Sequence, residues 1–343
     1  MKILVTGGAG FIGSHYVRHV LDTTNDRVTV LDALTYAGSR ENLGEMLLSP
    51  RLEFVRGIIL DPDLVAGLVE AHDTVVHLAA ESHVDRSFLA GGHFLTVNVL
   101  GTQRLLDAAR RFGVERFVHV STDEVYGPIA KGAAGEDDPL CPTVPYAASK
   151  AASDLVALSA FRTHGVPVCV TRSSNNYGPR QHPEKIIPRF VTSLIKGTTV
   201  GLHGDGRHVR NWLHAADNAA GIDLVLRRGV PGEVYNLGGG TDLTNRQLTD
   251  HILRLCGADW NSVEFIADRT SNDVRYAMHW EKAAALGYLP QHDFRDGLAA
   301  TIQWYRDHPD RWAPLLRNPD SPRPHVVVPH DDKNTAAPCA RTQ

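Results

Sequence analysis

Residues 5–15 read VTGGAGFIGSH and stand between a hydrophobic run, KILVT (2–6), and a helical pattern. Gly7 permits a tight turn, Gly10 lets the backbone approach a pyrophosphate, and Gly13 allows close packing of helix on strand. The positive N-terminal end of the helix then faces the phosphates. The stretch therefore predicts a strand–turn–helix unit that binds a dinucleotide. The alternatives are a glycine turn without a ligand and the apolar segment of a signal peptide, which the glycines and the helical pattern disfavour.

The next hydrophobic run, RVTVLD (27–32), ends in Asp32, about 20 residues after the glycine turn. A carboxylate at this position binds the ribose hydroxyls of the adenosine. The same charge would repel the 2′-phosphate of NADP. The pair of motifs therefore favours NAD as the cofactor.

Similar short apolar runs recur along the first half of the chain and predict further strands. Their nearly continuous apolar character is typical of a parallel sheet covered on both faces. Segments with helical spacing separate them, which predicts an α/β fold with a Rossmann-type, doubly wound parallel sheet. The runs are LEFVRG (52–57), TVVHLA (74–79), RFVHVST (116–122) and VPVCVTR (166–172).

The alternation loosens after about residue 173, and we expect a smaller C-terminal lobe interleaved with the sheet. An S/T-x-x-E/Q capping box, Thr244 to Gln247, opens a helix there. The tail is rich in Pro, Asp and Thr, which predicts disorder. The expected boundaries are 1–172 for the NAD-binding domain with 215–235 returning to it, 173–214 and 236–317 for a substrate-binding lobe, and 318–343 for the tail.

Composition excludes several classes of protein. The 343 residues carry a formal charge of −4 without a basic run, which argues against nucleic-acid or anionic-membrane partners. No window approaches the ~18 apolar residues of a transmembrane helix. The four cysteines are scattered, as in a cytoplasmic protein with reduced thiols. The histidines show no spacing that indicates a metal site, so none is assigned.

The stretch HVSTDEVYG (119–127) places two acids, Asp123 and Glu124, directly after an apolar run. They are either a solvated turn or the acid and base of a reaction. Neighbours on a regular strand point to opposite faces. Both carboxylates can face one substrate only if the backbone leaves strand geometry at Thr122. Tyr146 and Lys150 are spaced i, i+4 and share a helix face, where the ammonium is expected to lower the pKa of the phenol.

With these motifs the chain resembles the extended short-chain dehydrogenase/reductase family, and within it the dTDP-glucose 4,6-dehydratases. The similarity runs from Met1 to about Leu316. Its most specific signals are the acid pair, the ESHVDRS stretch and the pattern NNYGPxQxPEK. The stretches that carry it are TGGAGFIGSH (6–15), LDALTYAG (31–38), HLAAESHVDRS (77–87), STDEVYG (121–127), PYAASKAASD (145–154), RSSNNYGPRQHPEKIIP (172–188), GDGRHVRNWLH (204–214) and EVYNLGGG (233–240).

The resemblance implies a redox-neutral dehydration of dTDP-glucose to dTDP-4-keto-6-deoxyglucose. Tyr146 accepts the C4 hydroxyl proton while hydride passes to tightly bound NAD+, with Thr122 bonded to the same oxygen and Lys150 supporting the phenolate. Glu124 then removes the C5 proton, Asp123 protonates the departing C6 hydroxyl, and hydride returns to C6. Two carboxylates hold opposite protonation states when their environments separate their pKa values.

The resemblance also implies two sets of contacts. The cofactor set joins residues of the strand ends to the catalytic tyrosine and lysine, namely Gly7, Gly10, Phe11, Ile12, Gly13, Asp32, Leu34, Thr35, Ile58, Ile59, Leu78, Ala79, Ala80, Asn98, Ser121, Tyr146, Lys150 and Asn176. The substrate set supplies cations and amides suited to a nucleotide diphosphate, namely Ser82, Thr122, Asn175, Asn176, Lys185, Arg210, Asn236 and Arg269. A homodimer through a four-helix interface is implied, with helices at 98–112 and 147–164.

The chain departs from the family pattern at several positions. Ile58 stands where an aspartate usually meets the adenine, a loss of about 0.5–1.5 kcal/mol, or at most about tenfold in affinity. Further departures leave the nucleotide and the sugar open, namely Asn211, Thr270, Asn272 and His279.

Three other functions are weighed against the dehydratase. A dehydratase acting on a UDP- or GDP-linked sugar retains the same catalytic set. A 4-epimerase typically has small residues where this chain has Asp123 and Glu124, because it eliminates no water. A silent NAD-binding regulator is expected to have lost Thr122, Tyr146 or Lys150, and all three are present.

Overall fold

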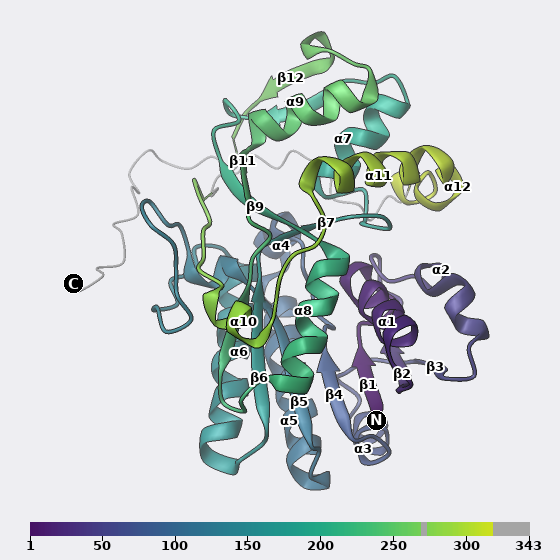
Figure 1. Cartoon of the computed structure of the whole chain (residues 1–343), viewed down its shortest axis with the longest axis vertical. Helices are drawn as coiled ribbons and strands as arrows, with labels where there is room; N and C mark the ends of the chain where they lie inside the picture. The colour runs from purple at the N-terminus through teal and green to yellow at the C-terminus, as the bar shows by residue number, and fades with distance from the viewer. Residues whose placement is uncertain (269–272, 318–343) are drawn as a thin grey trace.

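The computed structural model describes residues 1–268 and 273–317. Its centre is a seven-stranded parallel sheet in the order β10-β6-β5-β4-β1-β2-β3 (Figure 1), which confirms the predicted fold class. Six of the strands correspond to the predicted runs, and the seventh lies in the stretch EVYNLGGG (233–240). Their bounds are β1 (Lys2–Thr6), β2 (Arg27–Asp32), β3 (Leu52–Arg56), β4 (Thr74–His77), β5 (Arg116–Thr122), β6 (Val168–Ser173) and β10 (Val234–Leu237).

Helices cover both faces of this sheet, which is why its strands are apolar at successive positions. Ile3, Leu4 and Val5 of β1 are all fully buried, although neighbouring side chains point to opposite faces. One face is covered by α1 (Phe11–Thr23), α8 (Ala215–Arg228) and α10 (Glu281–Leu286). The other is covered by α3 (Pro62–Glu70), α5 (Gly101–Phe112) and α6 (Pro145–His164), with α4 (Val84–Leu95) beside α6. A π-helical turn, η2 (Thr96–Leu100), joins α4 to α5, and α2 (Arg40–Leu43) and η1 (Gly44–Leu48) follow β2.

The smaller lobe is built from segments that alternate along the chain with pieces of the large sheet. Thr244 Oγ1 accepts from the Gln247 amide at 3.1 Å, and Gln247 Oε1 accepts from the Thr244 amide at 2.8 Å, so the predicted capping box is confirmed. The strands are β7 (Asn175–Tyr177), β9 (Val209–His214) and β11 (Thr241–Thr244) in one sheet, and β8 (Val200–His203) and β12 (Val263–Ile266) in another. The helices are α7 (Ile186–Ile195), α9 (Asn245–Cys256), η4 (Trp260–Ser262), α11 (Phe294–Asp307), α12 (Pro309–Trp312) and η5 (Leu315–Arg317).

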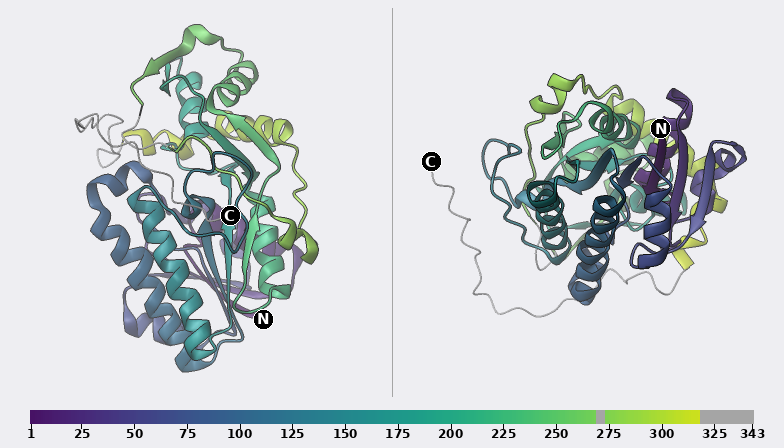
Figure 2. Two further views of the ribbon diagram at one scale, coloured as in Figure 1. Left: turned by 90° about the vertical axis from the view of Figure 1, so that its left-hand side faces the viewer. Right: turned by 90° about the horizontal axis from the view of Figure 1, so that it is seen from below.

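The chain order of the large sheet reverses between β1 and β4. Strands β2 and β3 extend from β1 in one direction, whereas β4, β5 and β6 extend in the other. The loops that follow β1 and β4 therefore diverge at the carboxyl edge of the sheet, where open α/β folds bind their ligands. The smaller lobe lies over this edge (Figures 1 and 2).

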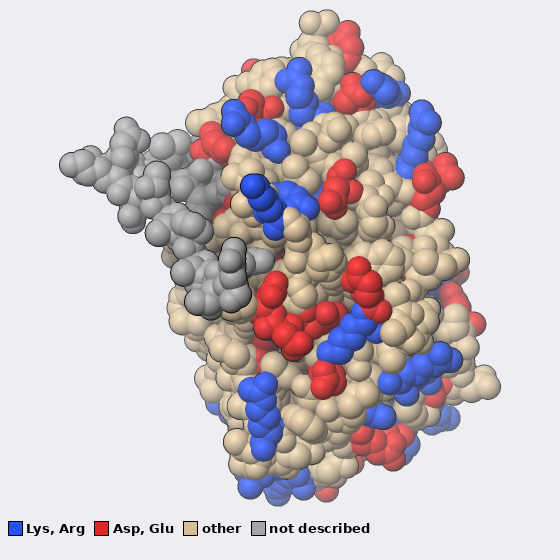
Figure 3. All heavy atoms as spheres, turned by 60° about the vertical axis from the view of Figure 1, so that its left-hand side comes forward, with Lys and Arg blue, Asp and Glu red and all other residues tan. Residues whose placement is uncertain are grey.

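Two further observations concern the surface. On the face drawn in Figure 3, acidic side chains gather near the middle and basic side chains are scattered around them. Among the described helices, none combines the length and the apolar character that a membrane crossing requires.

Candidate active site

The acid pair lies where β5 turns into a short 3-10 helix, η3 (Asp123–Tyr126). Thr122 is the last extended residue, with φ −140° and ψ 154°, and its hydroxyl accepts a hydrogen bond from the Glu124 amide at 3.3 Å. The predicted departure from strand geometry at Thr122 is confirmed. Because η3 starts at the carboxyl edge of the sheet, it brings both acids to the region where the two lobes meet.

The two acids lie in different surroundings. Asp123 is 3% exposed, and its Oδ1 accepts from the Thr122 hydroxyl at 3.3 Å. Its Oδ2 is buried and has no hydrogen-bond partner in the part of the chain that the structure describes. Burial and the charge of Glu124 raise the pKa of Asp123 to about 8, against the opposing effect of Arg210. Glu124 instead lines the pocket between the lobes. At neutral pH, Asp123 is therefore mainly protonated.

Tyr146 and Lys150 lie in the first turns of α6, which begins at Pro145. The Lys150 ammonium donates to the carbonyl of Val120 at 2.8 Å, and burial lowers its pKa to about 8. Desolvation together with Glu124 and Asp123 raises the pKa of Tyr146, whereas a hydrogen bond with Thr122 lowers it. The i, i+4 spacing predicted a lowered pKa for the Tyr146 phenol. This prediction is wrong for the protein without its cofactor, in which the pKa is raised. The sequence spacing indicates the nearby lysine, but it gives no sign of the two carboxylates, whose charges raise the pKa of Tyr146.

A chain of buried polar groups runs behind Lys150. His119 Nε2 lies 3.3 Å from Asp154 Oδ1, and Asp154 Oδ2 accepts from the Arg172 guanidinium at 2.9 Å. Arg172 also donates to the Tyr126 hydroxyl at 2.8 Å, which donates to Asn236 Oδ1 at 2.7 Å. The Asn236 amide donates to two backbone carbonyls and is fully buried. Asn236, predicted to contact the substrate, is therefore placed in this network and not in the pocket lining.

The glycines of the turn after β1 pack closely against neighbouring backbone. Gly7 has φ 72°, and a Cβ on it would lie 2.6 Å from the Ala79 amide; a Cβ on Gly13 would lie 2.2 Å from the Gly7 carbonyl. Gly10 is the N-cap residue of α1, and no side chain among the described residues caps that helix. The first amides of α1 are therefore directed to the carboxyl edge, as binding of a dinucleotide phosphate requires.

Asp32 lies beside this turn, and Ser121 lies near the carboxyl end of β5. The Asp32 carboxylate accepts from the Ala9 amide at 2.9 Å and from the Leu34 amide at 2.8 Å, and Leu34 is held at φ 53°. A carboxylate offers about four acceptor positions, so lone pairs remain for ribose hydroxyls. The Ser121 hydroxyl is buried without a partner in the described chain. The turn, the carboxylate and the hydroxyl together fit NAD.

The other residues expected at the cofactor differ in their placement. Ile58 is 51% exposed just after β3, whereas Ile59 is buried against Gly101. Asn98 is buried, and its amide group bonds both backbone groups of Glu81 and the Ser149 hydroxyl. It therefore holds the loop after β4. The remaining members lie in α1 or in the loops that follow β2 and β4, namely Phe11, Ile12, Thr35, Leu78, Ala79 and Ala80.

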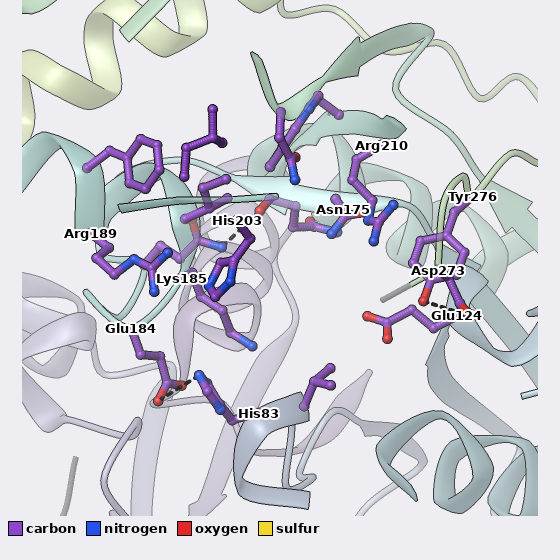
Figure 4. Close-up of a pocket in the computed structure, with 18 of the residues that line it drawn as sticks. His83, Glu124, Asn175, Glu184, Lys185, Arg189, His203, Arg210, Asp273 and Tyr276 are labelled. Atoms are coloured by element: carbon purple, nitrogen blue, oxygen red, sulfur yellow. Dashed lines mark hydrogen bonds and ion pairs between the residues drawn. The ribbon is translucent and has the colours of Figure 1, made fainter. Parts of the chain in front are cut away.

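A pocket opens between the two lobes beside Glu124 (Figure 4). Lys185, whose ammonium donates to the Ser82 carbonyl at 2.8 Å, and Arg210, whose guanidinium lies 4.3 Å above the Tyr276 ring, bring cations to it. Of the expected residues, it is lined by Glu124, Asn175, Asn176, Lys185 and Arg210. Sequence reasoning missed other lining residues, namely His83, Val84, Val144, Gln181, Glu184, Ile186, Arg189, Phe190, Gly201, Leu202, His203, Trp212, Asn245, Asp273 and Tyr276.

The two asparagines at the pocket differ in their bonding. Asn175 Oδ1 is buried without a partner among the residues described, whereas the amide of Asn176 donates to the Ser174 carbonyl and its Oδ1 accepts from Asn218. Arg269, Thr270 and Asn272 lie outside the described residues.

Two departures from the family pattern are away from the pocket lining. Asn211 donates to Asp242 Oδ1 at 2.7 Å and accepts from the Gly239 amide at 2.8 Å, so it fastens β9 to its neighbours. His279 is exposed and pairs with Glu281 at 3.4 Å. Asn211 therefore stabilises the sheet of the smaller lobe, whereas His279 lies on the surface next to α10.

The chain is similar to proteins of known activity over nearly its whole length. The model of the NAD dependent epimerase/dehydratase family matches residues 3–238. A dTDP-glucose 4,6-dehydratase of Streptomyces antibioticus is 56% identical over 94% of this chain and 97% of its own. A dTDP-glucose 4,6-dehydratase of Streptomyces venezuelae, crystallised with NAD, aligns with a TM-score of 0.90 and 54% identity over 92% of this chain and 100% of its own. A UDP-glucose 4-epimerase of Thermotoga maritima has a TM-score of 0.83 and 30% identity over 90% of this chain and 99% of its own. These similarities confirm the predicted resemblance to the dehydratases.

Proposed function

The chain belongs to the NAD dependent epimerase/dehydratase family, and on that premise we propose that it dehydrates dTDP-glucose to dTDP-4-keto-6-deoxyglucose. It is an NAD-dependent hydro-lyase. The observation that carries this proposal is the turn at Thr122, which brings a buried, protonated Asp123 and a pocket-lining Glu124 to the same edge of the sheet.

The first task of the chain is to take the C4 hydroxyl proton of the hexose. Tyr146 accepts it, with the Thr122 hydroxyl bonded to the same oxygen and Lys150 holding the strand end through the Val120 carbonyl. When bound, NAD would take up the hydride of C4 and later return it to C6, and the positive charge of its oxidised ring would oppose the raising of the Tyr146 pKa by the two carboxylates. Gly7, Gly10, Gly13 and Asp32 would hold it.

The second task is to eliminate water from C5 and C6. Once C4 is a ketone, the C5 proton is acidic, and the Glu124 carboxylate removes it. The C6 hydroxyl leaves only when protonated, and Asp123 donates that proton because its pKa of about 8 keeps it protonated at neutral pH. The two acids thus divide the work of a base and an acid, as in other enzymes whose paired carboxyl groups differ in pKa.

The nucleotide part of the substrate belongs in the pocket of the smaller lobe. Lys185, Arg189 and Arg210 supply positive charge for the diphosphate, and Asn175 supplies an amide whose oxygen is unpaired within the described chain. We assign nucleotide-sugar binding to segments 173–214 and 236–317, and dinucleotide binding to 1–172 with the segment around 215–235 that returns to it. Ser82 contributes through its carbonyl, which positions Lys185.

The nearest competing functions are a 4-epimerase and a dehydratase acting on a UDP- or GDP-linked sugar. An epimerase has no use for a buried protonated acid beside Glu124, because it eliminates no water. A non-catalytic NAD-binding regulator is disfavoured because Thr122, Tyr146 and Lys150 are intact.

The test is to incubate the purified protein with dTDP-, UDP- and GDP-linked glucose and to follow the mass of each. The proposal expects loss of one water from the dTDP sugar without net accumulation of NADH. An isobaric product would establish epimerisation instead. Faster loss of water from another nucleotide sugar would overturn the assignment of the nucleotide.

We further propose a homodimer formed through the helices beside the sheet. Large apolar side chains are exposed on α4, η2 and α6, which lie together on one side of the molecule (Figure 2). A second copy would cover them in an interface that includes the four predicted helices, 98–112 and 147–164 of each subunit. The residues are Phe88, Leu89, Leu95, Leu100 and Leu155. Cytoplasmic location is proposed as well, supported by the free thiols of the cysteines that the structure describes.

A further inference from the structure

A cluster of charged and aromatic side chains joins three loops at one end of the pocket. Its centre is Glu184, whose Oε2 lies 3.6 Å from His83 Nε2, 3.6 Å from Arg86 Nε and 3.8 Å from His182 Nδ1. The Arg86 guanidinium lies 3.6 Å above the centre of the Tyr36 ring, and His182 packs edge-on against the same ring at 5.5 Å. We call Tyr36, His83, Arg86, His182 and Glu184 the Glu184 cluster.

Topology places this cluster across the dinucleotide site. Tyr36 lies in the loop that follows β2, and Arg86 lies in α4 just after the loop that follows β4. In the sheet, β2 and β4 are the two neighbours of β1. The contact between Arg86 and Tyr36 therefore spans the glycine turn that follows β1. The Tyr36 loop is also tied to that turn, since the Ser39 amide donates to the Ala9 carbonyl at 3.0 Å.

The same cluster reaches into the nucleotide pocket. Glu184 comes from the segment between β7 and α7, and the next residue, Lys185, donates to the Ser82 carbonyl at 2.8 Å. His83, Glu184 and Lys185 all line the pocket (Figure 4). Glu184 thus contacts His83 and Arg86, which follow β4 at the cofactor site. It also directly precedes Lys185, which is expected to bind the substrate.

The contacts of Glu184 depend on its charge. Burial raises the pKa of this carboxyl, and Lys185 and Arg86 oppose that effect. Burial and the neighbouring cations lower the pKa of His182 to about 4, so this imidazole is neutral at pH 7. Arg86 is therefore, with Lys185, a cationic partner of Glu184, and its guanidinium is held over Tyr36. Removing one charge from such a partly buried pair leaves the other uncompensated.

We propose that the Glu184 cluster is a clasp over the bound dinucleotide, which makes retention of the cofactor depend on occupancy of the nucleotide pocket. The proposal rests on the function proposed above. A redox-neutral cycle needs the same cofactor molecule at its first and last steps, so the cofactor must not leave while the sugar is a ketone. Glu184, Arg86 and Tyr36 are positioning residues in this account.

The experiment measures the rate at which NAD dissociates from the full-length protein, with and without dTDP in the pocket. Wild type is compared with Glu184→Gln, which keeps the shape and removes the charge. The matched control is Glu281→Gln, which removes a carboxylate from an exposed histidine pair at 3.4 Å on α10. We expect Glu184→Gln to raise the dissociation rate on the order of tenfold, to abolish the slowing by dTDP, and to release NADH during turnover.

A second variant, Tyr36→Leu, removes the ring beneath Arg86 and keeps the Glu184 carboxylate. Tyr36→Leu should also raise the rate of NAD dissociation. It replaces Glu184→Gln in the experiment if that variant does not fold. Dissociation rates and dTDP effects equal to wild type in the folded variants would overturn the clasp. A lowered melting temperature with unchanged NAD release would also overturn it, because that result indicates a structural role. A wild-type protein that neither binds NAD nor dehydrates any nucleotide sugar would overturn the proposed function itself.

Discussion

The catalytic turn and the nucleotide pocket are built in different ways. The catalytic residues come from two short segments, 121–124 and 146–150. The first lies at the end of β5 and the start of η3, and the second lies at the start of α6. The pocket is assembled from separate stretches of the chain, from His83 beside α4 to Tyr276 after β12. Chemistry is therefore encoded locally, whereas recognition of the nucleotide depends on how distant segments meet. Changes in the first region should affect turnover, and changes in the second should affect binding.

The largest effect is expected at the tyrosine. Tyr146→Phe removes the acceptor of the C4 hydroxyl proton and should lower turnover by about 10²- to 10⁴-fold. Because the ring remains, NAD should stay bound, and the amount of NAD per folded protein serves as the control. Measurement of steady-state turnover with dTDP-glucose checks the prediction. A loss of less than tenfold would show that another group accepts the proton.

The buried acid should be visible in the pH dependence of both turnover and stability. The pKa of Asp123 is about 8 in the folded chain against an ordinary value of 3.8. The stability that this group contributes is complete below about pH 4 and is lost as the pH rises towards 8, by up to about 1.4 kcal/mol per pH unit. Turnover should fall above pH 8 for the same reason, since the proton donor is lost.

Asp123→Asn does not titrate and tests this directly. The melting temperature of Asp123→Asn minus that of wild type should increase steadily from pH 5 to pH 8. The dehydration activity of the variant should be lost at every pH. Thermal melts of the two proteins across this range provide the measurement. A difference in melting temperature that is constant with pH would contradict the raised pKa.

Substitutions in the nucleotide pocket should change the KM for dTDP-glucose. Arg210→Gln removes a guanidinium stacked 4.3 Å above Tyr276 at the pocket wall, and should raise KM for dTDP-glucose by about 10- to 100-fold. Arg246→Gln is the matched control, because Arg246 stacks 4.6 Å above Trp260 in the same lobe but outside the pocket lining. Equal KM values in the two variants would remove Arg210 from the substrate site.

The smallest effect is expected at Ile58, where an exposed apolar side chain stands at the edge of the cofactor site. Ile58→Asp restores a hydrogen-bond acceptor for the adenine amino group and should tighten NAD by at most about tenfold. Titration of the NAD-free protein measures the change. An unchanged affinity would sink the assignment of this position.

The sequence alone was sufficient where a motif is local. Four features were predicted correctly, and in each of them the residues involved are close neighbours in the sequence. They are the glycine turn, Asp32 at the end of β2, the departure from strand geometry at Thr122 and the capping box at Thr244. Their backbone geometry follows from nearby residue types. The carboxyl ends of parallel strands then meet at one edge, which brings the local motifs together.

The sequence was not sufficient where contacts are long-range. Pocket residues Gly201 to His203 lie in β8, which is held by pairing with β12 about sixty residues later. Nothing in the local pattern marks them as ligands. Asn236 belongs to the glycine-rich stretch EVYNLGGG, yet in β10 its side chain completes a buried network with Tyr126 and Arg172. The pKa of Tyr146 likewise depends on carboxylates that approach through the fold.

The measurement that tests the division of labour between the two acids most directly follows C5–H exchange in deuterium oxide. Wild type should yield a product that has lost one water and carries solvent deuterium at C5. Glu124→Gln should still oxidise C4, detected as bound NADH, but should leave the C5 proton unexchanged and form no dehydrated product. Full C5–H exchange by Glu124→Gln would contradict the account, because another group would then be the base.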